Sequence, residues 1–155
     1  MGQWNAVRPD LDASVMAEVA RVLHLARLMS DRLAAKASEY DLQVGEGDVL
    51  FTLFRAGPPH RLSPTQLADS TLVTTGTMTN RLDKLEARGL VRRIPNPQDR
   101  RGLAVELTAA GRKLVDRLVD EHVANEEQMM SALSGREREQ LARLTRKLLA
   151  HLVAE

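Results

Sequence analysis

The sequence contains no cysteine among its 155 residues. Disulfide bonds, thiolate metal sites and thiol-based redox sensing are therefore excluded. No apolar run approaches the ~18 residues that a membrane-spanning helix requires, and the N-terminus lacks the charged-then-apolar pattern of a signal peptide. These absences favour a cytoplasmic protein that does not enter a membrane. The length is typical of one domain that can bury a core of its own.

Recognisable catalytic motifs are also missing. The sequence has no nucleophile elbow, no phosphate-binding loop and no paired-carboxylate motif, so an enzyme would have no identifiable active site. The histidines are scattered, and no pair of them has the spacing of metal ligands; they are His24, His60, His122 and His151. We therefore expect no cofactor and no metal within one chain, although a metal site assembled across a dimer stays open.

Net charge is low, but its distribution is uneven. The whole chain carries a formal charge of +1, whereas the segment from Arg81 to Arg101 holds seven basic and three acidic residues, a local excess of four. Contacts between basic side chains and phosphates supply most of the non-specific affinity for nucleic acids. The uneven distribution therefore indicates a nucleic-acid-binding segment.

The hydrophobic pattern of this segment predicts a helix followed by a hairpin. Met78, Leu82 and Leu85 recur at i, i+4 and i+7, which predicts one buried stripe on a helix that begins near Thr74. Gly89 would end this helix with a left-handed cap. Beyond it, residues 90–94 and 103–107 read as two strands, and the proline- and glycine-containing loop at 95–102 joins them.

A second, shorter helix is expected just before this segment. Residues 63–66, Ser-Pro-Thr-Gln, form a capping box with proline at the first helical position, and the helix should run to about residue 70. Residues 71–73 then form a three-residue turn into the next helix, which is the pattern of a helix-turn-helix unit. Residues 60–62 are expected to form a short edge strand beside the hairpin.

Residues 74–108 resemble the MarR family of winged helix-turn-helix transcription regulators. The resemblance is carried by the stretch from Leu85 to Val91 and by the Asp99-Arg100-Arg101 hairpin tip, followed by Leu107 and Thr108. Long helices flank the motif as in that family. The resemblance implies a mainly α fold with a small β-wing in a single domain, 1–155. Residues 43–109 would form the winged helix-turn-helix lobe, and residues 1–42 and 110–155 a helical dimerisation lobe.

The flanking helices are expected at 13–39, with Asp12 as N-cap, at 42–56, at 109–132, capped by Thr108, and after the capping box at 134–137. The helix at 13–39 is apolar on two sides, more than one neighbour would need. We expect a second subunit to cover one side; the alternative is burial within one monomer. A two-fold dimer would place two recognition helices roughly 34 Å apart on a palindromic DNA site.

The candidate DNA-binding residues lie on the recognition helix and at the hairpin tip. Short polar side chains and one lysine could reach base edges and phosphates, although an ordinary solvated helix face would look similar. The resemblance implies that Arg101 enters the minor groove and that Asp99 orients it; the alternative is a solvated ion pair that contributes little. The candidates are Thr75, Thr77, Thr79, Asn80, Lys84, Asp99, Arg100 and Arg101.

Four further residues resemble those of a urate-responsive subgroup of the family. By that resemblance Trp4 and Arg93 would hold an anionic purine, Asp48 would respond to its charge, and Arg81 would relay the change to the recognition helix. An indole offers a stacking face and a guanidinium suits a planar anion. The alternatives are simpler: Trp4 fills the dimerisation lobe, Asp48 complements a helix N-terminus, and Arg93 touches phosphate.

The sequence therefore predicts a homodimeric DNA-binding regulator that acts as a repressor. A small aromatic anion such as urate or xanthine would release it from DNA. Two other readings stay open. The ligand could be a different phenolic or aromatic acid, or the chain could be a winged-helix module that binds proteins and never touches DNA.

Overall fold

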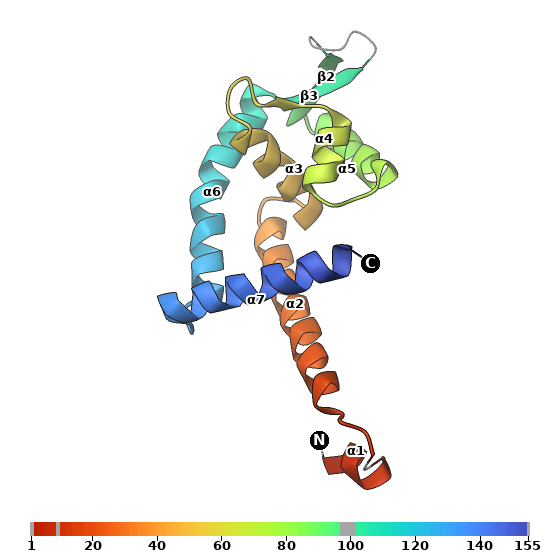
Figure 1. The fold of residues 1–155 in the computed structure, drawn as a ribbon. Helices are drawn as coiled ribbons and strands as arrows, with labels where there is room; N and C mark the ends of the chain where they lie inside the picture. Colours follow the sequence, from red (N-terminus) through yellow and green to blue (C-terminus); the bar gives the residue numbers. More distant parts are fainter. Residues whose placement is uncertain (1, 9, 97–101, 155) are drawn as a thin grey trace. The chain divides into compact units, whose positions relative to one another are not determined.

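The computed structural model describes residues 2–8, 10–96 and 102–154 (Figure 1). The chain divides into two compact units, residues 1–115 and 116–155, and each is described by itself. In the described ranges the elements are α1 (Gly2–Val7), α2 (Ser14–Ser38), α3 (Val44–Arg55), β1 (Arg61–Leu62), α4 (Pro64–Ser70), α5 (Thr75–Ala87), β2 (Val91–Pro95), β3 (Leu103–Leu107), α6 (Ala109–Met129) and α7 (Gly135–Val153). In these ranges no helix is both long enough and apolar enough to cross a membrane.

Local capping explains where α4 and α5 begin. The Ser63 hydroxyl accepts a hydrogen bond from Gln66 N at 3.1 Å, and the Gln66 side chain accepts one from Ser63 N at 2.8 Å, which confirms the predicted capping box. Thr74 caps α5 by accepting from Thr77 N at 3.3 Å. The helix ends before Gly89, whose φ of 66° is the predicted left-handed conformation.

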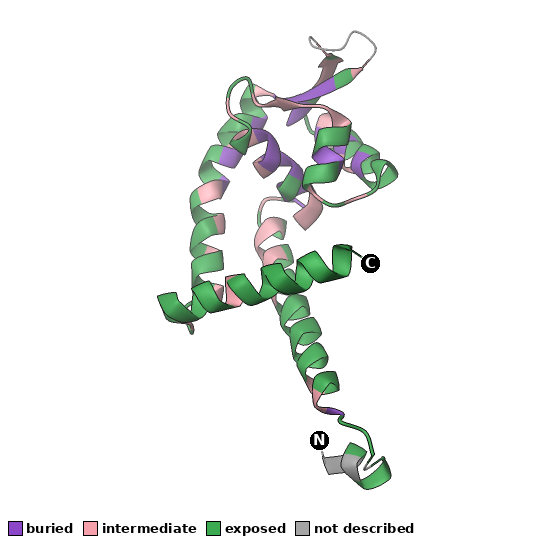
Figure 2. Ribbon diagram, in the orientation of Figure 1, coloured by how far each residue is buried: buried purple, intermediate pink, exposed green. Residues whose placement is uncertain are grey.

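The core lies among α3, α4, α5 and the sheet, which pack on one another (Figure 2). Met78, Leu82 and Leu85 of α5 are 1%, 1% and 0% exposed, so the predicted stripe is confirmed. The neighbouring elements also bury apolar side chains, which include Val49, Leu50, Leu53, Leu67, Val91 and Val105. Each such side chain contributes about 1.5–3 kcal/mol through burial, so this core holds α5 firmly against its neighbours.

The three strands form one antiparallel sheet in the order β1-β3-β2, with β1 at an edge as expected. The hairpin register pairs Arg92 with Glu106, and Arg61 of β1 also pairs with Glu106. The register places three charged residues side by side across the sheet. The predicted DNA contacts at the hairpin tip, Asp99, Arg100 and Arg101, lie outside the described residues.

Some boundaries differ from the sequence-based expectation. Residues 2–7 form the helix α1, which is too short to show a periodic pattern. Ala13, not Asp12, occupies the N-cap position of α2, although the Asp12 carboxylate accepts from Ser14 N at 3.0 Å. Helix α6 ends at Met129, before the predicted residue 132. Two glycines inside α3 are tolerated because Gln43 and Glu46 form a reciprocal capping box at its start.

Helix α2 contrasts with the core because none of its residues is buried. Seven of its large apolar residues are 50–65% exposed; they are Val15, Met16, Val19, Val22, Leu23, Leu25 and Leu28. In the second unit, α7 likewise exposes Leu144, Leu148, Leu149, Leu152 and Val153. The exposed apolar side of α2 is not covered within its own unit. What covers it stays a prediction.

Candidate nucleic-acid interface

The N-terminal half of α5 presents an exposed polar surface. The side-chain amide of Asn80 is exposed and makes no hydrogen bond with any described residue. Apart from its chain neighbours and the nearby backbone of α5, no heavy atom would lie within 4 Å of a Cβ built on Gly76, so this surface is also open. An unpaired amide that offers a donor and an acceptor is suited to the edge of a base in a groove.

The threonines of this half are exposed but locally bonded. The Thr77 hydroxyl lies 3.0 Å from the Thr74 hydroxyl at the cap. The Thr79 hydroxyl donates to the carbonyl of Thr75 at 2.9 Å. Since a hydroxyl has two lone pairs besides its proton, Thr79 can still accept hydrogen bonds from outside. Thr75 is exposed at the first position of the helix.

The C-terminal half of α5 is held by the junction between α2 and α3. Arg88 donates to the carbonyls of Asp41 and Tyr40 at 2.6 Å and 3.2 Å. Lys84 Nζ donates to Gln43 Oε1 at 3.2 Å and lies 3.9 Å from the buried carboxylate of Glu46. Lys84, predicted to contact DNA, therefore already has partners on α3, although its side chain is 46% exposed.

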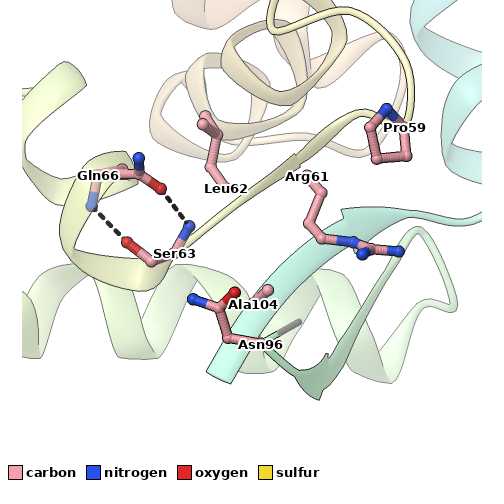
Figure 3. A pocket seen from close by; sticks show the side chains of 7 residues that line it. All are labelled: Pro59, Arg61, Leu62, Ser63, Gln66, Asn96 and Ala104. Carbon is pink, nitrogen blue, oxygen red and sulfur yellow. Dashed lines mark hydrogen bonds between the residues drawn. The ribbon is translucent and has the colours of Figure 1, made fainter. Parts of the chain in front are cut away.

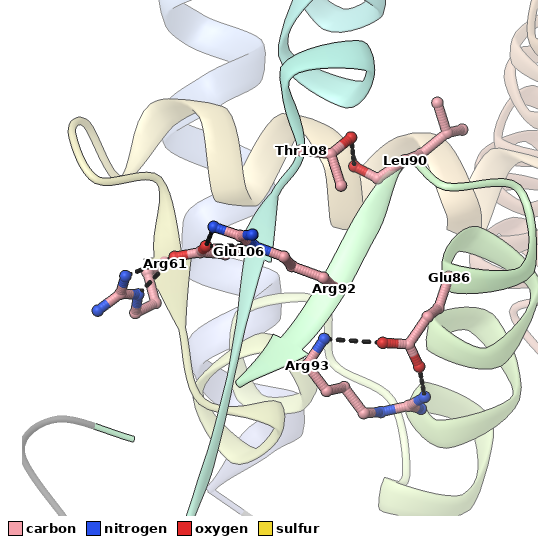
Figure 4. A network of polar contacts seen from close by, with 7 residues as sticks. All are labelled: Arg61, Glu86, Leu90, Arg92, Arg93, Glu106 and Thr108. Atoms are coloured by element: carbon pink, nitrogen blue, oxygen red, sulfur yellow. Dashed lines mark hydrogen bonds and ion pairs between the residues drawn. The ribbon is translucent and has the colours of Figure 1, made fainter. Parts of the chain in front are cut away.

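The wing strand is tied to the other side of α5 through Arg93 (Figure 4). Its guanidinium contacts the Glu86 carboxylate at 2.5 Å and the Asp83 carboxylate at 2.6 Å, and its backbone N–H donates to Glu86 at 2.8 Å. Burial lowers the pKa of Arg93, but the bonds to Asp83 and Glu86 outweigh it and raise the pKa above its usual value. The predicted ligand residue thus serves, in this structure, as a link between β2 and the recognition helix.

A second network crosses the sheet at Glu106. The carboxylate of Glu106 is 6% exposed and accepts hydrogen bonds from Arg61 Nε at 2.8 Å and Arg92 Nε at 2.6 Å. Burial raises the pKa of Glu106, but the hydrogen bonds from the two arginines outweigh it and lower the pKa below its usual value. Two cations on one carboxylate leave a net positive charge on this face of the sheet. The sequence-based reasoning missed this network, which the alternation of charge in the strands could have suggested.

Arg81 of α5 lies against α3, the helix that carries Asp48. A Cβ built on Gly45 of α3 would lie 2.2 Å from Arg81 Cζ, so the guanidinium lies against the α3 backbone. Asp48 follows Gly45 by three residues and therefore shares its face of α3. Arg81 Nη1 is buried and has no hydrogen-bond partner in the described part of the chain.

The other two predicted ligand residues are placed differently. Arg93 approaches α5 from β2, on the side of Asp83 and Glu86. Trp4 lies on α1, 46% exposed, and the 25 residues of α2 separate it from α3. At 1.5 Å per residue that helix is about 37 Å long. Within one chain the structure therefore does not bring Trp4 to Arg81 or Asp48.

A small pocket lies beside the base of the wing, between β1, the start of α4 and the hairpin (Figure 3). Its volume is about 170 Å³, below the usual range of about 300–1,000 Å³ for small-molecule sites. None of the four predicted ligand residues lines it; the lining is Pro59, Arg61, Leu62, Ser63, Gln66, Asn96 and Ala104. This pocket is therefore not the predicted ligand site.

Comparisons with known proteins identify the scaffold that carries this surface. The sequence profile of the MarR family matches residues 40–102. The transcriptional regulator PecS of Dickeya dadantii (strain 3937) is 38% identical over 151 residues, which cover 97% of this chain and 91% of PecS. The chain belongs to the MarR family. It is a DNA-binding transcriptional regulator of that family and not an enzyme.

Solved MarR-family structures share the fold. AbsC from Streptomyces coelicolor matches with a TM-score of 0.86 at 22% identity, over 94% of this chain and 98% of AbsC. Sco3205 from the same organism, solved in complex with DNA, matches with a TM-score of 0.84 at 25% identity, over 92% of this chain and 89% of Sco3205. The mainly α fold with a small antiparallel wing is thus that of MarR-family regulators.

Proposed function

We propose that this MarR-family protein is a homodimeric repressor that leaves its palindromic operator when a small aromatic anion, urate or a related purine, binds near Arg81. The observation that carries the proposal is the two-sided character of α5. Its N-terminal half exposes an unpaired amide at Asn80, whereas its C-terminal half is anchored to α3 and β2. Such a helix can touch DNA at one end and respond to its supports at the other.

In the proposed complex the N-terminal half of α5 lies in the major groove. Asn80 would read a base edge there, since asparagine forms a bidentate pair with adenine. Thr75, Thr77 and Thr79 would accept or donate hydrogen bonds to bases and phosphates. The hairpin tip, with Asp99, Arg100 and Arg101, would lie over the neighbouring minor groove. Lys84 would make a weaker phosphate contact, because the Glu46 carboxylate lies 3.9 Å from its ammonium group and offsets part of its charge.

The proposed dimer uses the exposed apolar side of α2. Seven large apolar side chains at 50–65% exposure on one helix are more than scattered surface residues would supply. A second copy of the chain is the proposed cover, because two-fold pairing places two recognition helices on one palindrome.

The proposed ligand site begins at Arg81. A buried N–H without a partner costs about 1–3 kcal/mol, so an anion that supplied the missing acceptor to Arg81 Nη1 would regain this energy. The same anion would repel Asp48, which lies one turn from Gly45 on α3. An anion that also drew Arg93 away from Asp83 and Glu86 would loosen the link between β2 and α5.

Trp4 enters this site only through the dimer. If two α2 helices pair antiparallel, the α1 of each chain lies near the α3 end of the other α2. An indole from the second copy could then cover the bound anion by stacking. The ligand response is therefore expected to require the dimer.

The experiment for DNA binding is a mobility-shift titration against the DNA that flanks the protein's own coding sequence. Asn80→Ala is expected to weaken binding about 30-fold or more, because the variant dimer loses one bidentate base contact in each half-site, without changing thermal stability. Gln140→Ala, which removes an exposed amide from α7, serves as the matched control. Equal binding by the Asn80→Ala variant and the wild type would contradict the proposed placement of α5.

The experiment for the ligand adds urate, xanthine or 4-hydroxybenzoate to the protein–DNA complex. Urate or xanthine is expected to release DNA and to change the fluorescence of Trp4, the chain's single tryptophan. Arg81→Leu is expected to bind DNA but to ignore the purine, whereas Arg55→Leu, exposed at the other end of α3, responds normally. A response to 4-hydroxybenzoate alone would replace the purine by a phenolic acid. Higher transcription from the same promoter after disruption of the gene distinguishes a repressor from an activator.

A further inference from the structure

Leu72 has an unusual combination of backbone and side-chain properties. It lies in the turn between α4 and α5, and its side chain is 93% exposed. Its φ of 53° lies in the left-handed region, which L-residues with a Cβ rarely adopt. The fold therefore accepts backbone strain at a position where the leucine side chain buries almost nothing.

The turn requires the left-handed conformation but not the leucine. Val73 N donates to the carbonyl of Ala68 at 3.1 Å, which closes the end of α4 across residue 72. Elsewhere the chain supplies this conformation with glycine, at Gly57 and Gly89, whose φ values are 72° and 66°. Leu72 is the only aliphatic residue among the described residues with positive φ. The turn accounts for the left-handed backbone, but the almost fully exposed leucine contributes little packing within the fold, and this points to a contact outside it.

The position of Leu72 indicates what that contact is. The residue precedes the N-cap Thr74 by two positions, so it lies at the end of α5 that enters the major groove in helix-turn-helix complexes. On the major-groove edges of base pairs the C5-methyl group of thymine is the apolar feature. We propose that Leu72 packs against a thymine methyl group at the edge of each operator half-site and so contributes to sequence selection.

This contact rests on the proposed insertion of α5 into the groove. The test replaces thymines of the bound DNA fragment one at a time by uracil, which removes only the C5-methyl group. For the wild-type dimer, one position in each half-site is expected to lose about fourfold in affinity, the equivalent of one buried methyl group. Leu72→Gly changes both subunits, so it is expected to bind the thymine fragment about 15-fold more weakly, the equivalent of two such methyl contacts, and to lose nothing further with uracil at either position.

Two further variants separate this contact from a structural role. Leu72→Met keeps an apolar side chain and is expected to retain the sensitivity to uracil. Leu72→Asn tolerates the left-handed conformation without an apolar side chain and is expected to behave like Leu72→Gly. Thermal unfolding of Leu72→Gly should be no easier than that of the wild type, because glycine relieves the strain.

The outcomes discriminate between this contact and the proposed function. Wild-type affinity and an unchanged uracil profile in Leu72→Gly, with Asn80→Ala still impaired, would overturn the Leu72 contact alone. If neither Asn80→Ala nor Leu72→Gly changed the affinity for DNA, both the insertion of α5 and the Leu72 contact would be overturned. A uracil penalty that disappears in Leu72→Gly and persists in Leu72→Met supports the proposal.

Discussion

Helices α2 and α5 carry similar helical periodicity but use their apolar residues in opposite ways. Met78, Leu82 and Leu85 of α5 are at most 1% exposed, whereas seven large apolar residues of α2 are at least 50% exposed. The difference arises because α3, α4 and β2 surround α5 within the same chain. A periodic apolar stripe therefore predicts a buried face but does not say whether the same chain or another covers it.

The basic residues also divide into those that bond within the chain and those that remain for an outside partner. In the winged-helix part, four of the five described basic residues between Arg81 and Arg93 bond to groups of the same chain, namely Lys84, Arg88, Arg92 and Arg93. The local excess of positive charge is therefore partly used to hold the recognition helix and the wing in place. Net charge along the sequence overstates what remains for phosphate contacts.

The largest expected effect concerns dimerisation through the exposed apolar side of α2. Val19→Glu introduces a carboxylate at the centre of the exposed apolar surface. In a two-fold dimer it would remove two buried valines and bury two carboxylates, so dimerisation should weaken by about 5 kcal/mol or more. Analytical ultracentrifugation should show a monomer, and DNA binding should fail with it. His24→Glu, nearly half a turn around the same exposed helix, is the control that should remain dimeric.

The next effect concerns the α5 side. Leu82→Ala removes a side chain that is 1% exposed, so unfolding free energy should fall by about 2–5 kcal/mol. Urea denaturation measures the change. Leu28 in α2 is 50% exposed within one chain. When Leu28→Ala is made in the monomeric Val19→Glu protein, the loss of unfolding free energy should therefore be clearly smaller. Equal costs at the two positions would remove the contrast between the helices.

The third effect depends on pH and tests the pairing of charges within the winged-helix part. Since the folded-state pKa of Glu106 lies below its ordinary value of 4.5, its contribution to stability is present above that pH. It is lost as the pH falls through the lower, folded-state value. Glu106→Gln should lower stability at neutral pH by about 1–3 kcal/mol and should flatten the loss below pH 4.5, as thermal melts across that range would show.

The smallest effect compares two glycines that occupy the same second position in their helices. Gly76→Ala in α5 meets open space and should stabilise the protein by about 0.5 kcal/mol. Gly45→Ala in α3 would place a Cβ 2.2 Å from Arg81 Cζ and must displace that guanidinium, so the gain should vanish and the purine response should change. The melting temperatures of the two variants would show that Gly76 faces open space and that Gly45 faces the Arg81 side chain.

Several parts of the candidate interface could be predicted from the sequence. The exposure of Asn80 followed from its place opposite Met78, Leu82 and Leu85, because helical periodicity is a local property. The partners of Arg93 could not be predicted, because the strand had to be docked on α5 before Asp83 and Glu86 came within reach. The same holds for Arg61 and Glu106, which are 45 residues apart in the chain.

The sequence by itself determined the succession of helices and strands after α1, the capping boxes that begin at Ser63 and Ser134, and the apolar stripe of α5. These features depend on neighbours within a few residues, so the local sequence contains the information. Only the tertiary structure decided that Arg88 holds the carbonyl of Asp41, 47 residues away, and that the Arg81 guanidinium lies against Gly45. Such contacts depend on how separate elements pack, because their geometry exists only once the core has brought the elements together.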